Sequence, residues 1–270
     1  WTMVEDVGGM ITKPGTRTIS EFSKWKEELE WPDLSLVDFK TDGEKIQKML
    51  DPDRVHIYEC VEGIFERLHE LIPFDESLMA FYEEPELLEE FFQKMADYKI
   101  ESTGKIFQYY GRVDGVLYHD DWGTQRAGFF SNEMFRNQIM PATSRFLKFV
   151  KDQGKFIELH SCGKNVQYVP EMIEMGIDMW TPQAEINDPD ELYEKYGDKM
   201  TFAFFVNIPP QADEKEIRKI VRDFVDHYGA KGRCMPCFMT DMSNPAQSEA
   251  AHDELYHYSL EYYNKLYHRD

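Results

Sequence analysis

The chain has 270 residues, of which 42% are hydrophobic and 14% aromatic, so it is long enough to form one large domain with a sizeable core. Its 51 acidic residues against 30 basic ones give a formal net charge of −21. This balance argues against nucleic acid and anionic membranes as partners, because both need clustered Lys and Arg. We find neither an apolar run of the roughly 18 residues that a membrane span needs nor a secretion signal.

The four cysteines also bear on the compartment of the protein. A large chain without a secretion signal more often keeps its thiols for metal binding or catalysis than for disulfides. We therefore expect a cytoplasmic protein.

The first 50 residues are the least regular part of the sequence. Gly8-Gly9 and Pro14-Gly15 indicate turns, and a strand near Met3-Val4 is the one candidate element. A strand over 55–61 followed by a helix over 64–72 forms the first strand–helix pair.

From about residue 100, short apolar runs alternate with amphipathic stretches. We predict strands over 115–118, 156–159, 177–180, 201–206 and 233–237, and helices over 133–153 and 214–228. In the second helix the apolar side chains form one face: Ile217, Ile220, Val221, Phe224 and Val225. A tyrosine-rich helix over 248–268 is expected to pack on the exterior.

Strands that alternate with helices of this length predict βαβ units and a parallel sheet. We therefore predict an α/β fold, a (β/α)8 TIM-barrel-like single domain over 1–270. Six strands are clear where a closed barrel needs eight, so N-terminal elements are expected to be missing. A doubly wound open sheet is the competing architecture, although no Gly-x-Gly-x-x-Gly supports a dinucleotide site.

His160-Ser161-Cys162-Gly163 directly follows a predicted strand. Residues two apart on an extended strand point to the same side, so His160 and Cys162 can face one centre at the carboxyl end of the strand. Imidazole and thiolate together favour zinc. The alternative is that the cysteine is ordinary core material and that the histidine only satisfies a hydrogen bond.

Cys237 ends another strand-like run and is the third candidate ligand. Strand ends converge on one mouth of a barrel, and three protein ligands leave a fourth position open, as in catalytic zinc sites. Strand alternation points Cys234 to the opposite side, so we expect it to be a wall residue.

Polar side chains follow several other predicted strands. After the strand at 115–118 come Asp120 and Asp121, which we predict to be catalytic, although an Asp N-cap for the next helix is the plain alternative. Four further residues are predicted to contact substrate: Trp122, Gln125, Gln183 and Asn207. For Gln183 and Asn207 the alternative is an ordinary role in a turn.

These motifs together resemble the uroporphyrinogen decarboxylase superfamily, and specifically its corrinoid-linked methyltransferase branch, over about residues 50 to 240. The resemblance is carried by His119-Asp120-Asp121-Trp122-Gly123, His160-Ser161-Cys162-Gly163, Trp180-Thr181-Pro182-Gln183 with Asn187-Asp188-Pro189, and the strand at 232–237. The opening residues 4–9 and 13–15 resemble a segment that these proteins carry well inside the chain. An N-terminal portion is therefore expected to be absent.

The resemblance implies a zinc ion held by His160, Cys162 and Cys237. It also implies methyl transfer to or from the cobalt of a corrinoid (a methylcobamide) carried on a partner protein. The zinc would either hold a small thiol, such as coenzyme M, as a thiolate or act as a Lewis acid on a methoxy compound. A second copy of the chain, in a homodimer, is a further candidate partner.

Two other functions were weighed. A decarboxylase of this superfamily uses cationic side chains and an N-terminal arginine motif that this chain lacks, and it would leave the zinc ligands unexplained. A non-catalytic relative that binds a corrinoid protein or a small ligand is the other alternative, because missing strands would leave an open barrel edge.

Overall fold

The computed structural model of the protein describes residues 2–4, 9–11, 16–241 and 243–268. The chain divides into two compact units, residues 1–178 and residues 179–270. Both are built from parallel strands and helices in alternation, so the predicted α/β class is confirmed. The single domain over 1–270 stays a prediction.

The N-terminal unit opens with a small hairpin. β1 (Thr2–Val4) pairs antiparallel with β2 (Gly9–Ile11). The strand expected near Met3-Val4 is therefore present, but its partner is β2 and not a strand of the parallel sheet. Short helical elements follow: η1 (Phe22–Lys24), α1 (Trp25–Glu28), η2 (Leu34–Leu36) and α2 (Phe39–Gln47).

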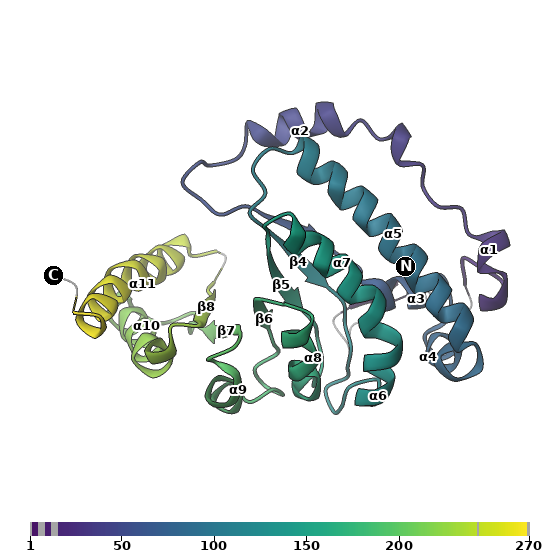
Figure 1. The fold of residues 1–270 in the computed structure, drawn as a ribbon. Helices are drawn as coiled ribbons and strands as arrows, with labels where there is room; N and C mark the ends of the chain where they lie inside the picture. Colours follow the sequence, from purple (N-terminus) through teal and green to yellow (C-terminus); the bar gives the residue numbers. More distant parts are fainter. Residues whose placement is uncertain (1, 5–8, 12–15, 242, 269–270) are drawn as a thin grey trace. The chain divides into compact units, whose positions relative to one another are not determined.

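The sheet of this unit has three parallel strands in the order β3 (Ile57–Cys60), β4 (Gly115–His119) and β5 (Phe156–His160). Between β3 and β4 run α3 (Ile64–Leu71), α4 (Phe74–Glu83) and α5 (Pro85–Tyr109). Between β4 and β5 run α6 (Asn132–Met134), the π-helical turn η3 (Phe135–Ile139) and α7 (Met140–Asp152). After β5 come η4 (Val166–Tyr168) and α8 (Val169–Glu174). Figure 1 shows α5 and α7 side by side against the strands.

Residue alternation on β4 and β5 decides which side chains reach the helices. Tyr118 and Leu159 are fully buried, as are their neighbours two residues earlier. The residues at the alternate positions, among them His119 and His160, lie on the other face and are only half-buried. The two histidines therefore project from the same face of the sheet.

The C-terminal unit holds the parallel strands β6 (Met179–Thr181), β7 (Thr201–Asn207) and β8 (Cys234–Met239). Its helices are α9 (Pro189–Tyr196), α10 (Glu214–Tyr228), η5 (Gly229–Lys231) and α11 (Pro245–Leu266). α10 has its predicted bounds, because Asp213 caps its first turn and Ile217 and Val221 begin its buried stripe. That stripe packs with Ile208, Ala212 and Ala251.

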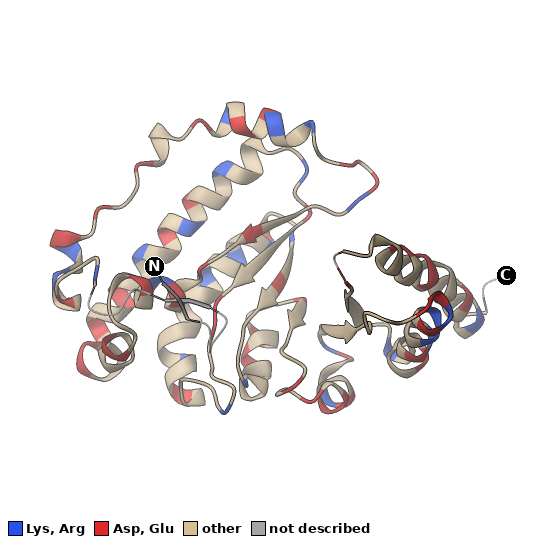
Figure 2. Cartoon of the chain, turned by 180° about the vertical axis from the view of Figure 1, so that it is seen from behind, with Lys and Arg blue, Asp and Glu red and all other residues tan. Residues whose placement is uncertain are grey.

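The acidic surplus is spread over the helices. Figure 2 shows Lys and Arg interspersed with Asp and Glu along them, while the strands carry few charged residues. Many are ion-paired, as Arg218 is with Glu254 at 2.8 Å. Among the described residues, no helix combines the length and apolar character that crossing a membrane would need.

Candidate functional site

The ends of β4 and β5 bring two histidines together. His119 and His160 are register partners on neighbouring parallel strands. Their rings stack with centroids 4.8 Å apart and planes inclined by 25°. Both are half-buried, so they meet at a place that a small ligand or an ion can reach.

Cys162 joins this pair from the loop after β5. Its Sγ lies 3.3 Å from Nε2 of His160. Its backbone N–H donates to Oδ1 of Asp121 at 2.6 Å, which links the loop after β5 to the loop after β4. His160 and Cys162 thus face each other, with the Asp121 carboxylate beside them.

Close packing of the two loops fixes this arrangement. The Asn165 side chain donates to the Cys162 carbonyl at 2.6 Å and to Ser161 Oγ at 2.9 Å. Gly163 has φ +97°, and a Cβ added there would lie 2.3 Å from the backbone carbonyl carbon of Gly123. The glycines of the two motifs therefore permit the close approach that positions Cys162.

The Asp120 side chain does not join this group and instead caps the start of a helix. Its buried carboxylate accepts from the backbone N–H of Glu66 at 2.9 Å and of Phe65 at 3.3 Å, at the start of α3. Burial and the charge of Glu66 raise the pKa of Asp120 to about 7. Asp120 thus caps a helix that precedes it by more than 50 residues, whereas the sequence alternative was a cap for the following helix.

Glu66 is a site residue that sequence reasoning did not find. Its Oε2 lies 2.8 Å from Nδ1 of His119, and it also accepts from the Gly63 backbone N–H at 3.3 Å. Burial alone would lower the pKa of His119, but the Glu66 hydrogen bond and charge outweigh it and raise that pKa to about 9. Glu66 lies 53 residues before His119, so no local motif links them.

The side chains of His160 and Cys162 are uncharged in this environment. Burial and the neighbouring His119 lower the pKa of His160. Burial and the Asp121 carboxylate raise the pKa of Cys162 to about 12. A thiolate at Cys162 therefore needs a cation beside it, which a bound metal ion supplies.

His160 also belongs to a second set of potential metal ligands. Ligand atoms of His119, Asp121 and His160 all lie within 4.8 Å of one another. Two imidazoles and a carboxylate are a donor set that divalent transition metals accept.

The remaining predicted site residues belong to the loop after β4 or to the C-terminal unit. Trp122 is fully buried and packs edge-on against Phe135, with ring centroids 4.8 Å apart. Gln125 is exposed in the loop after β4. Three belong to the C-terminal unit: half-buried Gln183 follows β6, exposed Asn207 ends β7, and Cys237 is half-buried on β8 opposite Phe205 of β7. Their roles in binding stay predictions.

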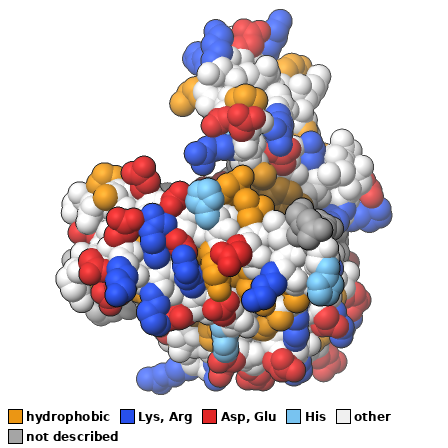
Figure 3. Space-filling model, turned by 90° about the vertical axis from the view of Figure 1, so that its left-hand side faces the viewer, with side chains coloured by type: hydrophobic (Ala, Val, Ile, Leu, Met, Phe, Trp, Pro, Cys, Tyr) orange, Lys and Arg blue, Asp and Glu red, His pale blue; other side chains and the backbone are white. Residues whose placement is uncertain are grey.

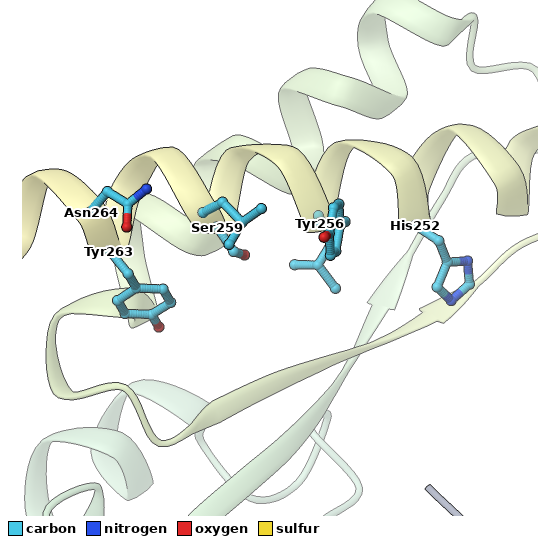
Figure 4. Close-up of a pocket in the computed structure, with 7 residues that line it drawn as sticks. His252, Tyr256, Ser259, Tyr263 and Asn264 are labelled. Atoms are coloured by element: carbon cyan, nitrogen blue, oxygen red, sulfur yellow. The ribbon is translucent and has the colours of Figure 1, made fainter. Parts of the chain in front are cut away.

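A shallow groove of about 450 Å³ runs along α11. Figure 4 shows its lining side chains projecting from one helix, among them His252, Tyr256, Ser259, Tyr263 and Asn264. Figure 3, which views the side on which α11 lies in Figure 1, shows hydrophobic side chains gathered among charged ones. The groove lacks the converging carboxylates and thiol found at the ends of β4 and β5, so we place the candidate site at those strand ends.

Comparison with known proteins bears on the family. A solved methyltransferase from Methanosarcina mazei matches with a TM-score of 0.62 and 17% sequence identity, over 83% of this chain and 64% of that one. At this identity the likeness shows the fold, and the chain spans about two thirds of the length of that structure. No match was found among curated proteins. The family model for uroporphyrinogen decarboxylase (URO-D) matches residues 2–233, most of the sequence. The chain therefore belongs to the uroporphyrinogen decarboxylase family.

Proposed function

We propose that this chain is a zinc-dependent methyltransferase. It moves a methyl group between a corrinoid carried on a partner protein and a small thiol or methoxy substrate. His160 and Cys162 hold the zinc ion, with Cys237 of β8 as the third ligand. The contact of 3.3 Å between His160 Nε2 and Cys162 Sγ is the observation that carries the proposal.

The donor atoms fit a zinc ion. Zn–S bonds of about 2.3 Å and Zn–N bonds of about 2.0–2.1 Å, at tetrahedral angles, separate the two donors by about 3.6 Å. The pair is already within a few tenths of an ångström of that spacing. One imidazole with thiolates is also the donor chemistry that zinc prefers.

The residues around the pair have defined tasks in this proposal. A zinc ion when bound supplies a positive charge that keeps a substrate thiol as thiolate near neutral pH. The Asp121 carboxylate accepts a hydrogen bond from the Cys162 backbone N–H, and the Asn165 side chain donates one to the Cys162 carbonyl. These hydrogen bonds keep the Cys162 thiol in reach of His160 and limit the motion of the loop between them.

The charges near the site favour methyl transfer over decarboxylation of a polycarboxylate. Glu66 and Asp121 are carboxylates that lie beside the two histidines in the N-terminal unit. Such carboxylates repel an anionic substrate. Arg67, a nearby cation, pairs with Glu62 and with Glu70.

Two further findings support the proposal. The neighbouring structure from Methanosarcina mazei is a methyltransferase with the same fold. None of the four cysteines is joined in a disulfide, which fits metal binding in a reducing compartment.

The first experiment measures metal content and activity together. The protein is purified anaerobically, and zinc is counted by inductively coupled plasma mass spectrometry beside methyl transfer from methylcobalamin to coenzyme M. We expect one zinc per chain and thiol methylation, both lost in His160→Ala and in Cys162→Ser. Cys234→Ser is the matched control for Cys237→Ser, because both side chains are half-buried on β8. Full activity in a metal-free Cys162→Ser variant would overturn the proposal.

A further inference from the structure

Two neighbouring side chains are not among the zinc ligands of the proposed function. His119 stacks on His160, and the ligand atoms of Asp121 and of both histidines lie within 4.8 Å of one another. Each is half-buried and comes from the end of β4, whereas Cys162 comes from the loop after β5. His160 belongs to both groups of donors.

His119 is held as a metal-binding histidine is held. Histidine ligands almost always direct their second ring nitrogen at a carboxylate or a carbonyl, which fixes the ring and its tautomer. Glu66 makes this contact with Nδ1 at 2.8 Å. Nε2 is then the nitrogen left to bind an ion.

The backbone of α3 holds Glu66 itself. Glu66 is the third residue of that helix, and its own N–H donates to Asp120 at 2.9 Å. The carboxylate therefore approaches His119 from a rigid element, which is what an outer-shell partner of a metal ligand requires.

Asp121 is oriented in a similar way. Its Oδ1 accepts from the Cys162 N–H at 2.6 Å, which fixes the carboxylate and leaves an acceptor position on the side of the histidines. Parallel neighbouring strands at a spacing of about 4.8 Å place His119 and His160 at the separation that one ion bridges.

We propose that His119, Asp121 and His160 form a second ligand set for a divalent transition metal ion, in which Glu66 orients His119. One ion per chain binds at His160, and His119 and Asp121 are the ligands that hold it there when Cys162 does not. The inference rests on the metal site of the proposed function but not on methyl transfer. The set suits borderline ions such as Zn²⁺ and Co²⁺.

The test removes the thiolates and asks whether a metal still binds. Cys162→Ser/Cys237→Ser protein is titrated with Co²⁺ by calorimetry and by absorption spectroscopy, with circular dichroism to confirm folding. We expect one Co²⁺ per chain without a thiolate-to-cobalt charge-transfer band, bound so much more weakly than in the parent protein that the metal is lost on purification and is seen only in the titration. Should the double variant not fold, Cys162→Ser alone serves the same comparison.

Further substitutions in that background identify the ligands. His119→Ala and Asp121→Asn should each abolish the residual binding, and Glu66→Gln should weaken it by about 10–100-fold. Gln keeps the helix-capping role of Glu66, so the change isolates its contact with His119. His252→Ala, an exposed histidine on α11, is the control and should change nothing.

The outcomes separate this inference from the proposed function. A folded Cys162→Ser/Cys237→Ser variant that binds no Co²⁺, or that binds it as tightly without His119 and Asp121, overturns the second ligand set. Zinc-loaded parent protein that methylates no thiol and demethylates no methoxy compound overturns the methyltransferase and leaves the ligand set standing.

Discussion

Gly63 lies so close to Asp120 that a Cβ added to the glycine would stand 2.2 Å from the aspartate Cβ. This approach lets the Asp120 carboxylate reach the first N–H groups of α3, those of Phe65 and Glu66. The start of α3 and the loop after β4 therefore behave as one element, and that element sets Glu66 against His119.

Gly63→Ala should move the start of α3 away from the loop after β4. The added methyl group must displace Asp120, and overpacking of this kind costs about 1–3 kcal/mol of unfolding free energy. Urea denaturation measures the loss, and metal affinity should fall with it because Glu66 moves. Gly104→Ala in α5 is the control: its Cβ meets only Phe149 at an ordinary 3.6 Å. That change should stabilise the helix by about 0.5–1 kcal/mol. Equal effects from the two substitutions would contradict the role of Gly63.

The fold was predictable where burial is periodic. α10 keeps its predicted bounds because its N-cap, Asp213, directly precedes the helix and its apolar stripe lies within it. The strand predicted over 177–180 lies instead at Met179–Thr181. The Asp178 backbone N–H donates to the Ile157 carbonyl, and the Asp178 carboxylate accepts from the Ile157 N–H. These contacts join residues that are far apart in the sequence, so a local sequence pattern does not predict them.

The site was predictable only in part. The spacing of His160 and Cys162 on an extended segment indicated their contact, which depends on two neighbouring residues alone. The roles of Asp120 and Glu66 depend on α3 packing against the end of β4, across more than 50 residues. A single sequence contains no local signal for a contact at that separation, so Asp120 was grouped with Asp121 although the two carboxylates face different partners.

His69 should make the stability of the N-terminal unit depend on pH. Burial lowers its pKa to about 4, from about 6.5 in the unfolded chain. The unfolded chain binds a proton at His69 more tightly than the folded protein does. The stability that the neutral His69 contributes is therefore fully present above pH 6.5 and is lost as the pH falls towards 4. Relative to His69→Leu, the parent protein should lose about 1–3 kcal/mol of unfolding free energy between pH 7 and pH 4. A stability difference that stays constant over this range would contradict the prediction.

Glu254 should hold α11 onto α10 in the C-terminal unit. Its side chain is buried at 4% exposure and accepts from Arg218 at 2.8 Å and also from Arg222. Glu254→Ala leaves both guanidinium groups without this partner, at a cost of about 1–3 kcal/mol. Hydrogen exchange followed by mass spectrometry should show faster exchange along α11. Glu249→Ala, at an exposed position of the same helix, should leave the exchange rates as they are; a similar acceleration there would rule out the specific role of Glu254.

Gly163 should be the glycine on which the metal site depends most. Its φ of +97° favours glycine, and a Cβ would also lie 2.3 Å from the backbone of Gly123. Gly154 offers a matched control, because it too has positive φ, at +70°, but nothing lies within 4 Å of an added Cβ.

Gly154→Ala should therefore cost only the conformational term of about 1–2 kcal/mol and leave metal affinity unchanged. Gly163→Ala should cost about 1–3 kcal/mol more, through the clash between the two loops. Zinc affinity should fall as well, because the neighbouring Cys162 moves away from His160. Calorimetric titration of both variants with zinc decides the point: equal affinities would mean that Cys162 keeps its place without the close approach of the two glycines, and that another contact, such as the one from Asn165, positions the thiol.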